Sequence, residues 1–134
     1  MSQDKTVLVV DDQDTIVHLV RTILYMEGYT VIFGCSGKDA LHVMENHPNP
    51  IHLLLTDIRL GEDLNGCDLA QSIRALRPEM RVLYMSAFPN DERVAREVAS
   101  GLAGFIPKPF SPLEMLSRVE ESLSDYALPG LNRL

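Results

Sequence analysis

Three aspartates, a serine and a lysine stand at points where short apolar runs of the chain end. Asp11 and Asp12 follow the first run, Asp57 ends a later one, and Ser86 and Lys108 come at the ends of two more. Carboxylates that lie close together repel one another and raise each other's pKa, unless a cation lies among them. Three hard oxygen donors with no thiolate or imidazole favour Mg²⁺, which keeps several waters and takes a phosphate partner. We therefore expect a magnesium site at which an ionised aspartate attacks phosphorus.

Each of these residues also has an ordinary structural explanation when it is taken alone. Aspartates after strands are common in turns and helix caps, and Asp12 or Asp14 could cap the first helix. A serine at a strand end or a lysine on the surface is unremarkable by itself. Compatible groups at four of five expected strand ends are much harder to obtain by accident, so the combination carries the prediction.

The elements that must position these side chains are predicted from hydrophobic periodicity. Apolar, β-branched runs predict strands over residues 6–10, 30–33, 51–56, 81–86 and 104–106. Apolar residues at helical spacing predict a helix after each strand, ending in turn at Gly28, at Asn46, before Pro78, at Gly101 and near Tyr126. Such a (βα)5 array, with right-handed crossovers, predicts an α/β fold: a doubly wound parallel sheet with helices on both faces. Ligands of such sheets bind beyond the carboxyl ends of the strands, where the candidate residues lie.

Composition limits the remaining possibilities. The chain has 134 residues with 12 basic and 19 acidic side chains, a formal net charge of −7. That balance opposes direct binding of nucleic acid, and no apolar run approaches the roughly 18 residues of a membrane helix. Cys35 and Cys67 have no CxxC spacing and favour a cytoplasmic location. We expect one domain over residues 6–126, with an N-terminal extension (1–5) and a C-terminal tail or start of a linker (127–134).

Four short motifs resemble those of a response-regulator receiver domain of the chemotaxis-regulator type, over residues 6 to about 126. They are Val-Asp-Asp after the first expected strand, Leu-Leu-Thr-Asp at the third, Met-Ser-Ala at the fourth and Ile-Pro-Lys-Pro-Phe at the fifth. The resemblance implies a flavodoxin-like sheet with strand order 2-1-3-4-5. It also implies a role in a two-component system or phosphorelay, with no enzymatic activity beyond the domain's own phosphorylation and dephosphorylation.

The resemblance assigns roles to the residues that match these motifs. Asp57 matches the phosphoacceptor, which receives its phosphoryl group from a histidine kinase or a histidine phosphotransfer protein. Asp11 and Asp12 match the acidic pair that binds Mg²⁺ together with Asp57, and Mn²⁺ is a possible substitute. Arg59 would offer its backbone carbonyl to the metal.

The same resemblance implies a switch. Ser86 and Lys108 match the hydroxyl and the cation that contact the phosphoryl group, and Phe105 matches the aromatic switch residue. The bond between Lys108 and Pro109 matches a cis peptide. Phosphorylation would alter the surface of the fourth helix, fifth strand and fifth helix, which an unknown downstream protein would bind. The protein would be a monomer or a phosphorylation-dependent dimer, with no membrane contact.

One segment departs from the family pattern. Residues 58–66 lack the Met-Pro-Gly-like turn that receivers commonly have after the phosphoacceptor. The segment is also one residue longer than its counterpart in the family. We expect Arg59 in this segment to interact with Glu62, with Asp63 or with the phosphoryl group. The positions of Arg59 and of Phe88, two residues past Ser86, resemble ones that tune phosphoryl lifetime in the family.

Several alternatives stay open at this point. The chain could be a stand-alone regulator, or a receiver segment of a hybrid histidine kinase or of a multidomain regulator. An FMN-binding flavodoxin-like module would need a Ser, Thr or Gly phosphate loop where Asp11-Asp12-Gln13-Asp14 stands. A phosphohydrolase of the haloacid-dehalogenase class would need a second acid two residues after its aspartyl nucleophile, where Arg59 stands.

Overall fold

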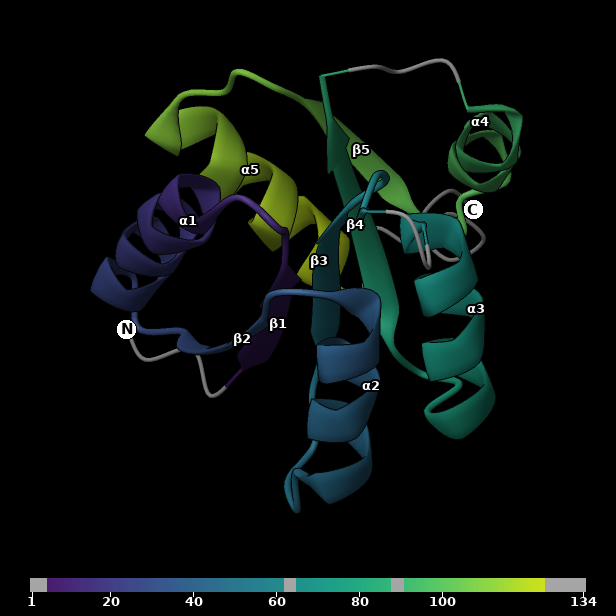
Figure 1. Cartoon of the computed structure of the whole chain (residues 1–134). Coiled ribbons are helices and arrows are strands. Elements are labelled where there is room, and N and C mark those ends of the chain that lie inside the picture. The colour runs from purple at the N-terminus through teal and green to yellow at the C-terminus, as the bar shows by residue number, and fades with distance from the viewer. Residues whose placement is uncertain (1–4, 62–64, 88–90, 125–134) are drawn as a thin grey trace.

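The computed structural model describes residues 5–61, 65–87 and 91–124 (Figure 1). Strands and helices alternate as β1 (Thr6–Val10), α1 (Asp14–Met26), β2 (Thr30–Gly34), α2 (Gly37–Asn46), β3 (Leu53–Asp57), α3 (Gly66–Leu76), β4 (Arg81–Ser86), α4 (Glu92–Ala99), β5 (Gly104–Pro107) and α5 (Pro112–Leu123). The strands form one parallel sheet in the order β2-β1-β3-β4-β5, which confirms the predicted topology.

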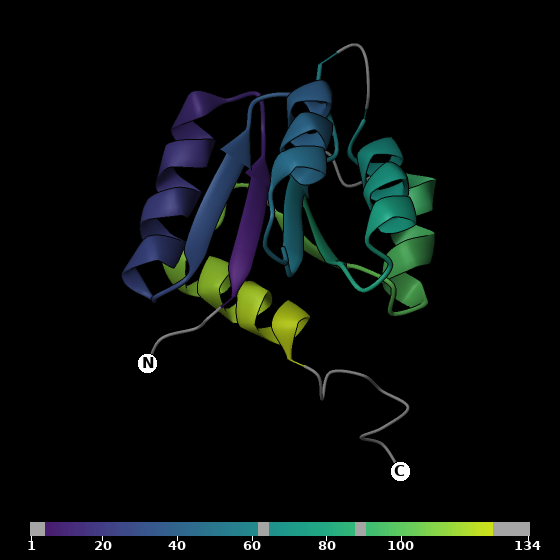
Figure 2. The same cartoon turned by 90° about the horizontal axis from the view of Figure 1, so that it is seen from below.

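The helices cover both faces of this sheet. Helices α1 and α5 lie on one face, and α2, α3 and α4 lie on the other, as Figures 1 and 2 show from two directions. The two central strands, β1 and β3, are buried almost throughout because helices shield them on both sides. Their apolar side chains alternate between the two core clusters, so the sheet joins both halves of the core.

The helix boundaries follow local capping chemistry. At the start of α2 the Ser36 hydroxyl accepts a hydrogen bond from the Asp39 backbone, while the Asp39 carboxylate accepts from the Cys35 backbone and not from Ser36. A complete capping box opens α5, where Ser111 and Glu114 bond reciprocally. Gly28 follows the end of α1 with φ of 91°, a conformation that costs glycine little.

Two details differ from the sequence prediction. Strand β3 begins at Leu53 and not at Ile51, although Ile51 is buried and the His52 backbone already bonds to Thr6 and Arg81. Leu19, Leu76 and Val98 fit the apolar spacing of their helices, yet they are 43%, 53% and 39% exposed. Each lies at the margin of its helix's buried face, where periodicity places a residue but the neighbouring elements do not cover it.

No helix within the described residues has both the length and the apolar character needed to cross a membrane.

Candidate functional site

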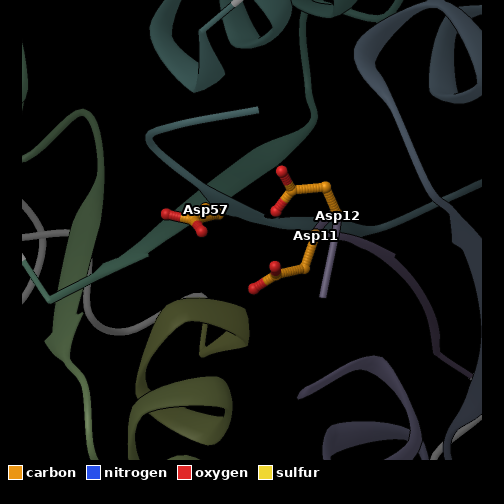
Figure 3. Close-up of side chains that lie close together, drawn as sticks. All are labelled: Asp11, Asp12 and Asp57. Carbon is orange, nitrogen blue, oxygen red and sulfur yellow. The ribbon is translucent and has the colours of Figure 1, made fainter. Parts of the chain in front are cut away.

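The three candidate aspartates meet at one end of the sheet. Val10 of β1 is paired with Thr56 of β3, so the residues that follow them, Asp11 and Asp57, emerge side by side. Carboxylate oxygens of Asp11, Asp12 and Asp57 all lie within 4.8 Å of one another (Figure 3). Asp11 is fully buried and Asp57 is 8% exposed, whereas Asp12 is open to solvent. The strand register therefore assembles the acidic cluster that the sequence predicts.

Lys108 supplies the positive charge of this cluster. Its ammonium nitrogen donates to Asp11 Oδ2 at 2.8 Å and to Asp57 Oδ2 at 3.0 Å, with Gln13 Oε1 at 3.3 Å. Its backbone N–H donates to the Ser86 carbonyl at 2.9 Å, and the peptide bond to Pro109 is cis, as predicted. Lys108 thus joins the ends of four strands through one side chain and one backbone bond.

Burial and charge act against each other at this ion cluster. Burial raises the pKa of the Asp11 carboxyl, although the hydrogen bond from Lys108 opposes that rise. Burial alone would lower the pKa of the Lys108 ammonium, but hydrogen bonds to Asp11 and Asp57 outweigh it and hold the pKa above its usual value. The lysine therefore stays charged beside the two buried carboxylates.

Backbone donors fix the second oxygen of each buried carboxylate. Asp57 Oδ1 accepts from the Arg59 N–H at 3.2 Å, and Asp11 Oδ1 accepts from the Gln13 N–H at 2.9 Å. Each carboxylate is therefore held from two sides, by a backbone amide and by Lys108. Two fixed carboxylates beside a third, exposed one form a preorganised anionic site.

A polar hollow of about 360 Å³ opens over this cluster. Its walls come from the loops after β1, β3, β4 and β5: Asp12, Gln13, Asp57, Arg59, Gly61, Ser86, Ala87 and Lys108. Ser86 is 1% exposed at the end of β4, next to the hollow and not projecting into solvent. The structure thus brings the predicted nucleophile, hydroxyl and cation to one cavity large enough for a phosphoryl group.

Two residues at this site were missed by sequence reasoning. The Gln13 side-chain oxygen lies near the Lys108 ammonium. Its position just after the Asp pair gave no indication of that contact. Gly66 starts α3 so close to β3 that an added Cβ would lie 2.3 Å from the Asp57 carbonyl oxygen. In the sequence Gly66 is visible only as part of a loop, and nothing there indicates that it contacts the Asp57 backbone.

Phe105 of β5 lies on the face of the sheet that α4 covers. It is partly buried and lines an apolar hollow of about 320 Å³ with Val94, Ala95, Val98 and Ala99. Its carbonyl accepts a hydrogen bond from the Arg118 guanidinium of α5. The predicted switch residue therefore contacts both helices of the predicted readout surface. Glu62, Asp63 and Phe88 lie outside the described residues.

Two histidines and both cysteines lie outside this site. His42 lies beside the Asn46 side chain, and His52 Nδ1 accepts a hydrogen bond from the Thr6 N–H at 3.0 Å. Cys35 is exposed, whereas burial raises the pKa of the Cys67 thiol and disfavours its reactive thiolate. Among the described residues, the only cluster of possible metal ligands is the aspartate trio.

The donor set of that trio fits a hard divalent cation. All three ligands are carboxylates, which suit Mg²⁺ and Mn²⁺ and not the softer metals that prefer thiolate or imidazole. Asp12 is exposed, so a cation there would keep part of its water shell, as Mg²⁺ does in proteins.

Known proteins resemble this chain along most of its length. Residues 7–120 match the response regulator receiver domain family. The sensor kinase CckA of Brucella abortus is 30% identical over 123 residues, which are 92% of this chain and 13% of the kinase. The response regulator SaeR of Staphylococcus aureus is 29% identical over 117 residues, 87% of this chain and 50% of the regulator. The chain thus spans half or less of the length of these two relatives.

Solved structures agree with the sequence matches. A CheY-like receiver domain protein from Methanospirillum hungatei superimposes with a TM-score of 0.79 at 30% identity, covering 89% of this chain and 93% of that one. The receiver domain of HemR from Leptospira biflexa gives 0.78 at 30% identity, covering 90% and 95%. Receiver domains act in two-component systems with histidine kinases and downstream effectors, and generally bind Mg²⁺ at an acidic site. Sequence, fold and strand-end chemistry agree: the chain belongs to the response regulator receiver domain family.

Proposed function

We propose that Asp57 is the phosphoacceptor of this receiver domain. Its carboxylate oxygen attacks the phosphorus of a phosphohistidine, the P–N bond breaks, and the electron pair remains on the donor imidazole. The observation that supports this role is the contact of Asp57 with the Lys108 ammonium at the floor of a solvent-accessible hollow. Lys108 neutralises charge on the incoming phosphoryl oxygens, and Ser86 lies where its hydroxyl can contact them.

Asp11, Asp12 and Asp57 would hold the Mg²⁺ ion, with Mn²⁺ as a substitute and the Arg59 carbonyl as a further ligand. The bound ion would offset charge on the acceptor and on the phosphoryl group. Backbone N–H groups hold Asp11 and Asp57 in place, whereas no backbone donor holds the Asp12 carboxylate within the described part of the chain. The chain's own contribution is therefore a rigid pair of ligands beside an adjustable one.

The signal would leave through the surface of α4, β5 and α5. Ser86 moving toward the phosphoryl group would vacate space near Phe105, which already lies between the two helices. A local charge change would then bias a two-state surface, the general form of a phosphorylation switch. We propose a protein partner in the cytoplasm as the reader, and a monomer or a phosphorylation-dependent dimer as the assembly.

Two settings are compatible with a receiver unit over residues 6–126. The relatives include a sensor kinase of which the chain covers 13% and a regulator of which it covers 50%. The domain therefore acts either alone or as a segment of a longer kinase or regulator, and in both cases its partners are a phosphohistidine donor and a downstream protein.

Small-molecule phosphorylation tests the assignment of Asp57. Incubation with Mg²⁺ and acetyl phosphate or phosphoramidate is expected to add a single phosphoryl group, measured by intact mass spectrometry. Asp57→Asn should abolish the adduct, since the amide is a poor nucleophile. Asp68→Asn, which changes an exposed aspartate of α3, serves as the matched control and should retain it.

Two results would contradict the proposal. An adduct that persists in Asp57→Asn would place the acceptor elsewhere, and peptide mapping would then locate it. Absence of any adduct from these donors, with Mg²⁺ bound and with a phosphorylated histidine kinase also supplied, would show that the site does not accept phosphoryl groups.

A further inference from the structure

Helix α4 is held to the molecule by few apolar contacts. It is eight residues long and Val94 is its only buried residue. Val98 is 39% exposed, and Ala95 and Ala99 are also open to solvent. An element with so little buried apolar surface opens easily unless polar contacts restrain it.

One polar contact reaches from this helix into the core. The hydroxyl of Tyr84, a fully buried residue of β4, donates to Glu97 Oε1 of α4 at 2.7 Å. The Arg74 guanidinium of α3 donates to the same oxygen at 2.9 Å. The side chains of Arg74 and Glu97 are only 19% and 17% exposed, so water screens this pair less than an exposed one. Three elements thus meet at a single carboxylate oxygen.

The contact of Tyr84, Glu97 and Arg74 also lies close to the predicted switch residues Ser86 and Phe105. Tyr84 lies two residues before Ser86 on β4, and its Cα partner on β5 is Phe105. Because paired residues of parallel strands point to the same face, Tyr84 and Phe105 both face α4. Arg74 and Glu97 also line an open groove of about 810 Å³ between α3 and α4. A shift of α4 or of the end of β4 would therefore stretch the bonds at Glu97.

We propose that Tyr84, Glu97 and Arg74 form a polar pin that holds α4 on the sheet and restrains the change that phosphorylation imposes on the α4–β5–α5 surface. The attachment of α4 to the sheet follows from the geometry alone, whereas the restraint on the phosphorylated arrangement rests on the proposed function of Asp57. By linkage, a restraint on the unphosphorylated arrangement lowers the affinity for anything that favours the other arrangement. Tyr84 and Glu97 are positioning residues in this scheme, since neither touches the phosphoryl group.

Amide hydrogen exchange tests the pin without phosphorylation. Tyr84→Phe removes one oxygen from the core and leaves Glu97 paired with Arg74. We expect exchange in α4 to accelerate by about threefold to tenfold, as the loss of one hydrogen bond predicts. Asp68→Asn is the control, because it weakens the exposed Arg93–Asp68 pair between the same two helices. Equal exchange in α4 of Tyr84→Phe and of the control would overturn the pin.

Beryllofluoride, which mimics a phosphoryl group on a carboxylate, tests the coupling. Its affinity in the presence of Mg²⁺ is measured by fluorine NMR for the wild type, Tyr84→Phe and Glu97→Gln. The two variants are expected to bind beryllofluoride about threefold or more tightly than the wild type, a coupling of ordinary size. Unchanged or weaker affinity would overturn the restraint on the switch. A wild type that binds no beryllofluoride would instead contradict the role of Asp57, and the exchange result would still decide the pin.

Discussion

At the scale of single residues, Lys108 supplies the positive charge that opposes the negative charge of the acidic cluster. Its ammonium contacts one oxygen of Asp11 and one of Asp57 while their other oxygens accept backbone N–H groups. Asp12, the exposed member, has no part in these bonds among the described residues. The lysine and a divalent cation would therefore share the same carboxylates, and each weakens the attraction of those carboxylates for the other.

This sharing leads to a prediction for Lys108→Ala. Removing the ammonium leaves three carboxylates close together, so Mg²⁺ affinity is expected to rise several-fold, as titration calorimetry would measure. Phosphorylation by acetyl phosphate should nevertheless slow by tenfold or more, because the cation that balances the incoming phosphoryl group is gone. Asp12→Asn is the contrasting variant and should weaken Mg²⁺ binding. Tighter binding in Asp12→Asn, or unchanged binding in Lys108→Ala, would contradict this balance of charge.

At the scale of elements, the start of α3 sets the geometry beneath the phosphoacceptor. The Gly66 N–H donates to the Ile58 carbonyl at 2.7 Å, and a Cβ on Gly66 would meet the Asp57 carbonyl at 2.3 Å. Asn65 caps this helix through the Asp68 N–H. The helix can approach β3 so closely only because its first residue has no side chain.

We therefore expect Gly66→Ala to move α3 away from β3. Backbone atoms cannot yield to the added methyl group, so the free energy of unfolding should fall by about 1–3 kcal/mol. Because the displaced backbone belongs to Asp57 and Ile58, phosphorylation by acetyl phosphate should also slow. Urea denaturation and intact-mass time courses measure the two effects. Cys67→Ala, a change at the next helical position, is the control that should keep the phosphorylation rate.

A wild-type rate and stability in Gly66→Ala would show that α3 does not set the position of the acceptor strand.

At the scale of the whole molecule, two core clusters on opposite faces share one sheet. Leu54 of β3 faces α2 and α3, whereas its neighbours Leu53 and Leu55 face α1 and α5. All three are fully buried. The central strands thus carry the stability of both layers and also hold the functional aspartates at their ends.

Shortening a side chain of a central strand is therefore expected to lower the free energy of unfolding. Leu54→Ala should lower the free energy of unfolding by about 2–5 kcal/mol, through lost burial and the cavity left behind. Leu113→Ala on α5 removes the same atoms from a side chain that is 78% exposed, and should change stability by less than about 0.5 kcal/mol. Guanidinium denaturation measures both. Similar losses in the two variants would contradict the assignment of the core.

The sequence alone determined the fold class of this protein and predicted which side chains gather at one end of its sheet. Buried strands of a parallel sheet read as continuous apolar runs, and the polar residue that ends each run is visible without coordinates. That is why the sequence could predict a cluster beyond the strand ends, formed by Asp11, Asp12, Asp57, Ser86 and Lys108. Periodicity also placed the helices, although residues at the margins of their buried faces, such as Leu19 and Leu76, are exposed.

Only the tertiary structure decided which atoms meet. The two bonds of Lys108 span 97 and 51 residues, the approach of Gly66 to Asp57 depends on helix packing, and the Tyr84–Glu97–Arg74 contact joins three elements. Local propensity and alternation carry no information on such distances, because they report the environment of one residue and not its partner. The partner is set by strand register and helix packing, which exist only once the chain has folded.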